Sequence, residues 1–115
     1  MDAASYQMKE LRSERVSDKM LRRILTAENF QITYVEAKED AEVPNHSHDN
    51  AEQITVMLEG SFMMVVEGKV HTLTKDSVLV IPRKVSHSGK VLKDCRYVDF
   101  HTAPVQLFKI PSSKV

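Results

Sequence analysis

The segment Gln53–Leu73 reads QITVMLEGSFMMVVEGKVHTL, and its pattern decides the fold class. Apolar and polar residues alternate through much of it, as they do in strands that bury one face. Gly60 interrupts the alternation, and Glu67-Gly68 has the composition of a tight hairpin turn. The strands expected here are 53–59, 62–66 and 70–73.

Shorter runs of the same kind precede this segment. Residues 20–25 fit one helical turn or a strand, and we favour a strand because turn-forming residues lead from it into a β-rich run. In that run, residues 30–37, the side chains of Phe30, Ile32 and Tyr34 share one face. Such alternation is typical of a half-buried strand.

Later in the chain, residues 78–81 are apolar at every position and end at Pro82. A run that is apolar on both faces is typical of a strand inside a sandwich or closed barrel. Two more strands are expected over 89–92 and 96–101. Because no segment of 10 or more residues has a convincing helical pattern, the sequence predicts an all-β sandwich or barrel.

Size and composition narrow the functional classes. A chain of 115 residues is one ordinary domain, and we expect residues 1–15 to be a flexible arm before a single domain over 16–115. Sixteen basic and 16 acidic side chains cancel, so no electrostatic footprint for nucleic acid or an anionic membrane is expected. The lone Cys95, the polar N-terminal sequence and the lack of a long apolar run favour a cytoplasmic protein.

Four polar side chains have the spacing of a metal site. His46 and His48 are two residues apart, so on a strand they point to the same face. With Gln53 and His87 arriving from later strands, they predict a site with three imidazoles, one amide oxygen and open coordination positions. The alternatives are two solvent-facing loop histidines, and a Gln53 amide that only forms hydrogen bonds within the barrel.

Two stretches resemble the cupin family. His46–Gly60, HSHDNAEQITVMLEG, is similar to the first cupin motif, and Asp76–His87, DSVLVIPRKVSH, is similar to the second. With the flanking strands, the resemblance covers roughly residues 20–101. It implies a double-stranded β-helix, also called a jelly-roll barrel, that binds a divalent transition metal. The metal is Fe, Ni, Mn, Co, Cu or Zn, because imidazole suits all of these and does not select one.

The chain departs from the cupin pattern at three positions. Asp76 and Lys84 stand where the second motif usually has glycines, which indicates two turns with positive φ that carry a Cβ atom. At the ligand position of the first motif, where glutamate is more common, the chain offers Glu52 and Gln53. The spacing to Gly60 in the family motif selects Gln53, and Glu52 is expected to face outward.

Among small cupins, the resemblance is strongest to the group of pectin-degradation enzymes that linearise unsaturated uronates. In that group a metal and an aspartate on the last strand promote ring opening by proton transfer, and Asp99 matches the aspartate. His101 stands where the group has an aromatic residue, and Val105 stands where it has an arginine. Asp99 and His101 share a face, so they form either a catalytic pair that moves protons or a structural pair at the barrel rim.

These residues predict a metal-dependent enzyme. The expected reaction is isomerisation, ring opening or enolisation of a small polar or anionic, sugar-acid-like metabolite, with the metal as Lewis acid. One alternative is a metal-dependent dioxygenase. Another is a non-catalytic domain that binds or senses a small molecule or sugar.

The resemblance also implies a homodimer. The apolar residues of segment 20–37 and of a tail with Leu107, Phe108 and Ile110 offer more hydrophobic surface than one barrel needs. Met57, Met63 and Met64 are expected to fill the core rather than line a pocket. His71 has no partner at ligand spacing and is expected to be structural or exposed.

Overall fold

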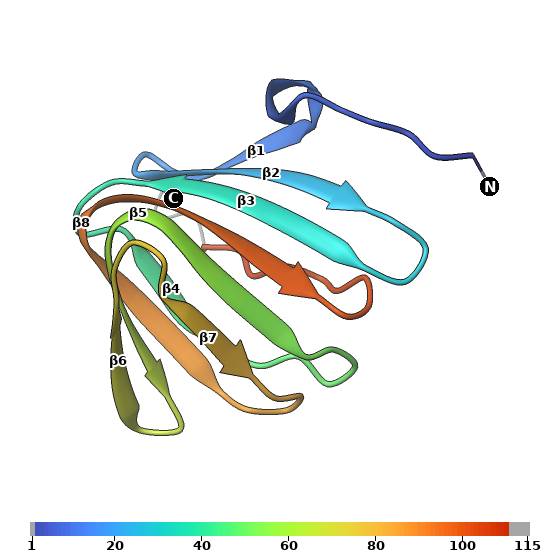
Figure 1. Ribbon diagram of the computed structural model, residues 1–115. Coiled ribbons are helices and arrows are strands. Elements are labelled where there is room, and N and C mark those ends of the chain that lie inside the picture. Colours follow the sequence, from blue (N-terminus) through green and yellow to red (C-terminus); the bar gives the residue numbers. More distant parts are fainter. Residues whose placement is uncertain (1, 111–115) are drawn as a thin grey trace, which may run out of the picture.

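The computed structural model describes residues 2–110, which form eight strands and one 3-10 helix, η1, at Met8–Glu10 (Figure 1). The strands are β1 Arg12–Ser17, β2 Met20–Thr26, β3 Gln31–Ala37, β4 Glu42–His46, β5 Gln53–Val66, β6 Lys69–Leu73, β7 Val78–Ile81 and β8 His87–His101. Every paired strand is antiparallel to its neighbour. Within residues 2–110, no helix is long and apolar enough to cross a membrane. The predicted all-β fold is confirmed.

The two long strands β5 and β8 run side by side and belong to both layers of the molecule (Figure 1). The end of β8 pairs with β3 and with the start of β5, and the start of β5 also pairs with β7. The start of β8 pairs with β4 and with the end of β5, and the end of β5 also pairs with β6. Both strands therefore cross from one layer to the other.

The crossing explains why the predicted strand boundaries differ from the observed ones. The segments 53–59 and 62–66 are one strand, because Gly60 forms a bulge rather than a turn. Gly60 has a φ of 86°, and a Cβ atom there would lie 2.1 Å from the carbonyl oxygen of Asp94 on β8. The two strands expected over 89–92 and 96–101 are likewise one bent strand.

Two turns have the positive φ that the sequence indicated. Asp76 has a φ of 71° and Lys84 a φ of 69°. The Lys84 N–H donates to the carbonyl oxygen of His48 at 2.8 Å. The turn before β8 is thereby tied to the loop that carries one of the histidines.

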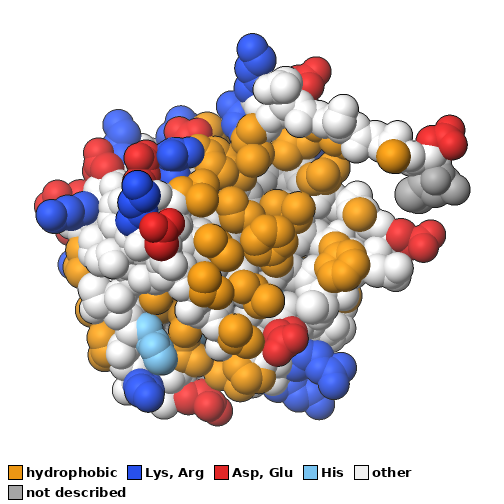
Figure 2. All heavy atoms as spheres, in the orientation of Figure 1, with side chains coloured by type: hydrophobic (Ala, Val, Ile, Leu, Met, Phe, Trp, Pro, Cys, Tyr) orange, Lys and Arg blue, Asp and Glu red, His pale blue; other side chains and the backbone are white. Residues whose placement is uncertain are grey.

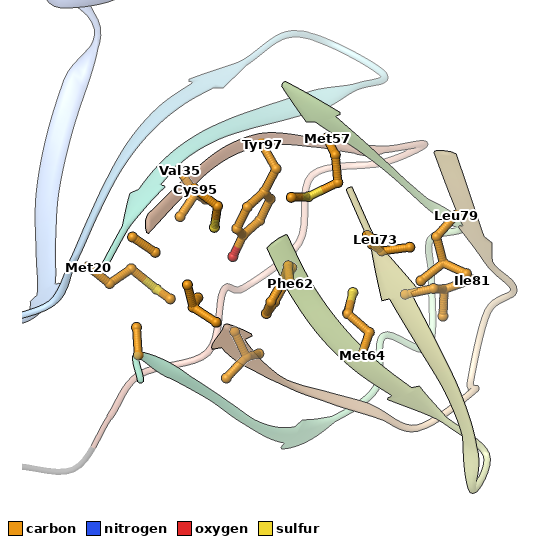
Figure 3. Close-up of a cluster of buried hydrophobic side chains, with 14 residues drawn as sticks. Met20, Val35, Met57, Phe62, Met64, Leu73, Leu79, Ile81, Cys95 and Tyr97 are labelled. Atoms are coloured by element: carbon orange, nitrogen blue, oxygen red, sulfur yellow. The ribbon is translucent and has the colours of Figure 1, made fainter. Parts of the chain in front are cut away.

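The hydrophobic core lies between the two layers (Figure 3). Phe62 on β5 and Tyr97 on β8 stack there, with ring centroids 4.8 Å apart. Met57 and Met64 are buried in the same cluster, as expected for core methionines, whereas Met63 on the opposite face of β5 is only half-buried. This core supports the cavity described below, because Phe62 and Tyr97 also line it.

One expectation about a strand needs correction. In β7 only Leu79 and Ile81 are buried, and Val78 and Val80 are 60% and 52% exposed, because this strand pairs with β5 alone and covers the core with one face.

In β3 the alternation has the expected period. Gln31, Thr33, Val35 and Ala37 form the interior face, and Phe30, Ile32 and Tyr34 share the other face, on which Tyr34 is also buried.

Residues 12–15 belong to β1 although they fall within the expected arm. They pair with β2 at the edge of the sheet, from Arg12 opposite Ile24 to Arg15 opposite Leu21. Alternation in this segment is weak because an edge strand buries little surface. The division of the chain into an arm and one domain stays a prediction.

Candidate metal centre

Three histidines converge inside the barrel, as their spacing predicted. His46 is the last residue of β4, His48 lies in the loop that follows, and His87 begins β8 directly opposite His46. One ring nitrogen of each lies within 4.8 Å of the others. The ring centroids of His46 and His87 are 4.2 Å apart. This arrangement can hold a metal ion.

Backbone carbonyls orient two of these rings. The Nδ1 atom of His46 donates to the carbonyl oxygen of Pro44 at 2.8 Å, and that of His87 donates to the carbonyl oxygen of Val85 at 3.0 Å. Because Nδ1 carries the proton in both rings, each Nε2 keeps a lone pair in the neutral form. The Nε2 atom of His87 is buried and has no hydrogen-bond partner. The donor set therefore fits a transition metal.

The cavity keeps these histidines neutral. Burial lowers the pKa of His87 to about 4, and burial also lowers the pKa of His46 and of His48. A histidine must be unprotonated to bind a metal. At neutral pH all three side chains are in the form that a metal requires.

A chain of hydrogen bonds joins the other predicted site residues. His101 Nε2 donates to Gln53 Oε1 at 2.9 Å, and Gln53 Nε2 donates to Thr55 Oγ1 at 3.0 Å. Thr55 Oγ1 in turn donates to Asp99 Oδ1 at 2.6 Å. The chain follows from register, because Gln53 faces His101 and Thr55 faces Asp99 across β5 and β8. Gln53 thus faces the interior and binds His101.

This chain fixes the tautomer of His101. Since its Nε2 carries the proton, its Nδ1 has the lone pair, and that atom is buried without a partner. The ring lies 4.8 Å from that of His48, centroid to centroid. Burial, followed by the charges of the other site histidines, lowers the pKa of His101 to about 3. His101 is therefore neutral at pH 7 and keeps a lone pair on Nδ1 close to the three histidines.

The pKa of Asp99 is raised, whereas those of the histidines are lowered. Burial raises the pKa of this carboxyl to about 7, and hydrogen bonding from Thr55 and Gln53 offsets part of that effect. The group is consequently divided between its protonated and ionised forms near neutral pH. Such a carboxyl can both give and accept a proton.

Except for Thr55, these side chains line one narrow cavity. Its free volume is about 20 Å³, room for roughly one water-sized group. Leu107 and Phe108 from the C-terminal segment also line it, and the Phe108 ring lies 5.4 Å from that of His46. Four buried polar atoms without hydrogen-bond partners belong to residues that line this cavity: Arg22 Nη1, Thr33 Oγ1, His87 Nε2 and His101 Nδ1. Unsatisfied atoms gathered in one place indicate a polar ligand.

Other expectations have mixed outcomes. Glu52 is exposed, as expected, and His71 is half-buried on β6, away from the cavity. Sequence reasoning missed Thr55, which connects Gln53 to Asp99. The signal was available, because Thr55 is two residues from Gln53 and therefore on the same face of β5. Sequence reasoning also missed Arg22, whose place between Met20 and Ile24 in the alternation of β2 already put it on the interior face.

Comparisons with known proteins agree with this architecture. No curated protein matches the chain. The structure is similar to KdgF from Halomonas sp., with a TM-score of 0.84, 20% identity, and coverage of 91% of this chain and 97% of that one. An RmlC-like cupin from Shewanella frigidimarina NCIMB 400 gives a TM-score of 0.82 at 18% identity, covering 91% and 95%. Oxalate decarboxylase from Bacillus subtilis gives 0.80 at 15% identity, covering 96% of this chain and 34% of that one.

These likenesses show the fold. A family model described as "Cupin domain" matches residues 33–101, more than half of the chain. The match includes the three converging histidines and the strand that ends at His101. The chain belongs to the cupin domain family.

Proposed function

We propose that the protein is a metal-dependent enzyme that isomerises, opens or enolises a small polar or anionic, sugar-acid-like metabolite. One observation carries the proposal: three neutral histidines converge in the cavity that also holds Asp99 and the free Nδ1 of His101. A metal site with a proton donor and a proton acceptor beside it suits reactions in which a proton leaves one atom and returns to another.

The metal would be held by His46, His48 and His87, with Gln53 as the fourth ligand. The Gln53 oxygen has a second lone pair, which the bond from His101 leaves free. When bound, a divalent metal would act as a Lewis acid that polarises a substrate oxygen. The ligand set has no carboxylate, so the charge of the cation stays uncompensated and favours an anionic substrate.

Asp99 and His101 would move the proton. His101 Nδ1 has the lone pair for this role, because Nε2 carries the proton that Gln53 accepts. Since the pKa of His101 is about 3, it would take a proton only from a substrate group that the metal makes acidic. Asp99, with a pKa of about 7, is able to return a proton to the product at neutral pH. Thr55 and Gln53 keep the two groups in position through the hydrogen-bond chain.

The first experiment is metal analysis of protein expressed without a histidine tag, followed by proton NMR with unsaturated uronates and related sugar acids. Exchange of a substrate C–H proton with solvent deuterium is expected for the metal-loaded protein. Asp99→Asn and His101→Ala are each expected to slow it by about a hundred-fold or more. A protein that folds fully but binds no transition metal would overturn the proposal.

Two other functions use the same centre. Open coordination positions beside three histidines also suit a dioxygenase with iron or copper, and turnover unchanged under strict anaerobiosis would exclude this. The small free volume of the cavity, about 20 Å³, favours a non-catalytic metal or ligand sensor. If a ligand binds the metal-loaded protein while Asp99→Asn and His101→Ala leave every turnover unchanged, the sensor is the better assignment.

The choice of metal is part of the same proposal. Fe, Ni, Mn, Co, Cu and Zn are all compatible with imidazole ligands. Among the structural relatives, Bacillus subtilis oxalate decarboxylase has Mn(II) centres. Titration of the metal-free protein with each ion, followed by chelator competition, would rank them.

A further inference from the structure

Arg22 is the most unusual buried side chain outside the predicted site. It is the third residue of β2 and faces inward, between the core residues Met20 and Ile24. It is 3% exposed and lines the same cavity as His46 and His87. Arginine is almost never this buried unless its charge has a function or a partner.

The partner of Arg22 is Glu14, which satisfies only some of the hydrogen-bond donors of the guanidinium. Glu14 on β1 accepts from Nε and Nη2 of Arg22 through one carboxylate oxygen. Nη1 is buried and has no hydrogen-bond partner among residues 2–110. Because arginine has donors only, the missing partner is an acceptor, and a negatively charged one binds best.

The Phe108 ring packs against the Arg22 guanidinium. The central carbon of the guanidinium lies 5.1 Å from the centroid of the Phe108 ring, and the same ring lies 5.4 Å from the ring of His46. Phe108 therefore contacts both the cation and the metal centre. Since the free volume is only about 20 Å³, a ligand that reaches both must displace the Phe108 side chain.

We propose that Arg22 binds the carboxylate of the substrate through Nη1, and that Phe108 occupies this position when no substrate is bound. The inference rests on the proposed function, because it concerns a ligand of the same cavity. Arg22 on β2 would supply the positive charge that is missing at Val105, where the uronate-linearising cupins have an arginine. Val105 there donates only its backbone N–H, to Gln31 Oε1 at 3.2 Å.

Because Arg22 pairs with Glu14, the proposal predicts opposite changes in ligand affinity for substitutions of these two residues. The probes are D-galacturonate and D-galactose, which differ by one carboxylate, and calorimetry on the nickel-loaded protein measures their binding. Arg22→Met is expected to weaken galacturonate binding about ten- to hundred-fold, because a charge-assisted hydrogen bond is lost. Glu14→Gln, which removes the competing carboxylate from a half-exposed position, is expected to strengthen it.

Two further variants act as controls. Arg23→Met changes the neighbouring arginine, which donates to the backbone oxygens of Lys9 and Leu11 outside the cavity, and is expected to leave both affinities unchanged. Phe108→Ala is expected to strengthen galacturonate binding, because it removes the side chain that must move. Galactose binding is expected to be equal in wild-type protein, Arg22→Met and Glu14→Gln.

The outcomes separate this inference from the proposed function. Nickel affinity, measured by chelator competition, is expected to be equal in wild-type protein and Arg22→Met. If galacturonate binds wild-type protein no better than galactose, or binds Arg22→Met as well as wild-type, Arg22 does not recognise the carboxylate, whether or not the metal centre is catalytic. If Arg22 proves necessary for galacturonate binding while no metal-dependent turnover is found, the inference stands and the enzymatic proposal fails.

Discussion

Gln53 on β5 and His101 on β8 face each other across the strand pair, and His101 Nε2 donates to Gln53 Oε1 at 2.9 Å. The amide oxygen of Gln53 accepts from His101, and its amide nitrogen donates to Thr55. The Gln53 amide thus sets which nitrogen of His101 carries the proton. Asp99 lies two residues before His101 on β8.

We predict that His101 in the metal-free protein carries its proton on Nε2. Nitrogen-15 chemical shifts of the imidazole will report the tautomer. Gln53→Leu is expected to remove the preference, whereas Gln106→Leu, at an exposed position, is expected to keep it. A wild-type protein with the proton on Nδ1 would contradict the hydrogen-bond chain.

The role of Gln53 as a metal ligand has its own test. Gln53→Leu is expected to lower metal affinity about ten- to hundred-fold, whether Gln53 binds the metal itself or acts on the site through His101. His101→Phe distinguishes the two roles, because a direct ligand still works without His101. Chelator competition that shows equal losses in both variants would mean that Gln53 acts only by positioning His101.

The stability of the metal-free protein is expected to depend on pH in a way that separates Asp99 from the histidines. His87 and His101, with pKa values lowered to about 4 and about 3, contribute stability above pH 6.5 that is lost as pH falls through those values. Asp99, with its pKa raised from 3.8 to about 7, contributes stability below pH 3.8 that is lost as pH rises through 7. Between about pH 4 and 6.5 these contributions oppose each other.

Asp99→Asn should therefore make the rise of unfolding free energy between pH 4.5 and 6.5 steeper, and His101→Phe should make it shallower. Urea denaturation of metal-free protein at several pH values will measure both slopes. Equal slopes in wild-type protein and Asp99→Asn would show that Asp99 ionises normally.

Two glycines with similar φ values are expected to tolerate alanine very differently. Gly60 and Gly68 have φ values of 86° and 80°. A Cβ atom at Gly60 would collide with β8 at 2.1 Å, while one at Gly68 meets nothing within 4 Å. Gly68→Ala is expected to destabilise by about 1 kcal/mol, and Gly60→Ala by about 3 kcal/mol or more because backbone must shift. Similar losses in urea denaturation would mean that the bulge can move freely.

The outer face of the sheet is the place where we expect a second copy of the chain to bind. Apolar side chains gather across the middle of this face (Figure 2). Cross-strand register places one row of apolar residues across five strands: Val80, Ile54, Phe100, Ile32 and Leu25. A broad apolar face suits a two-fold dimer.

Light scattering at micromolar concentration is expected to give a dimer for wild-type protein and a monomer for Val80→Lys combined with Phe100→Ser. Val70→Lys is the matched control, because Val70 is 57% exposed but lies on β6, outside the row. A wild-type monomer would remove this interface. Leu107 and Phe108, which the sequence assigned to the dimer surface, also line the cavity, and their part in a dimer stays a prediction.

Residue spacing was sufficient to predict that the three histidines converge, because their motifs are local. His46 and His48 are neighbours in sequence, and the second motif brings His87 to the adjacent strand. The Asp99–His101 pair was predicted in the same way, since residues two apart share a face. Positive φ at Asp76 and Lys84 was implied by the resemblance to the second cupin motif, which usually has glycines at these two positions.

The remaining features depend on contacts between distant segments. Alternation in β3 and β7 defines two faces but not which of them is inside, and that choice depends on the layer each strand joins. Arg22 meets Glu14 and Phe108 only after the first strands and the C-terminal segment pack against the barrel. No local pattern contains that information.

The single bent strand β8 has a consequence for the evolution of this site. It begins with His87 and ends with His101, residues that would lie roughly 45 Å apart in a straight strand. Yet their ring centroids lie 5.7 Å and 4.8 Å from that of His48. The bend thus sets the distance between His87 and His101, so a residue inserted or deleted near Asp94 is expected to change that distance while both side chains stay the same.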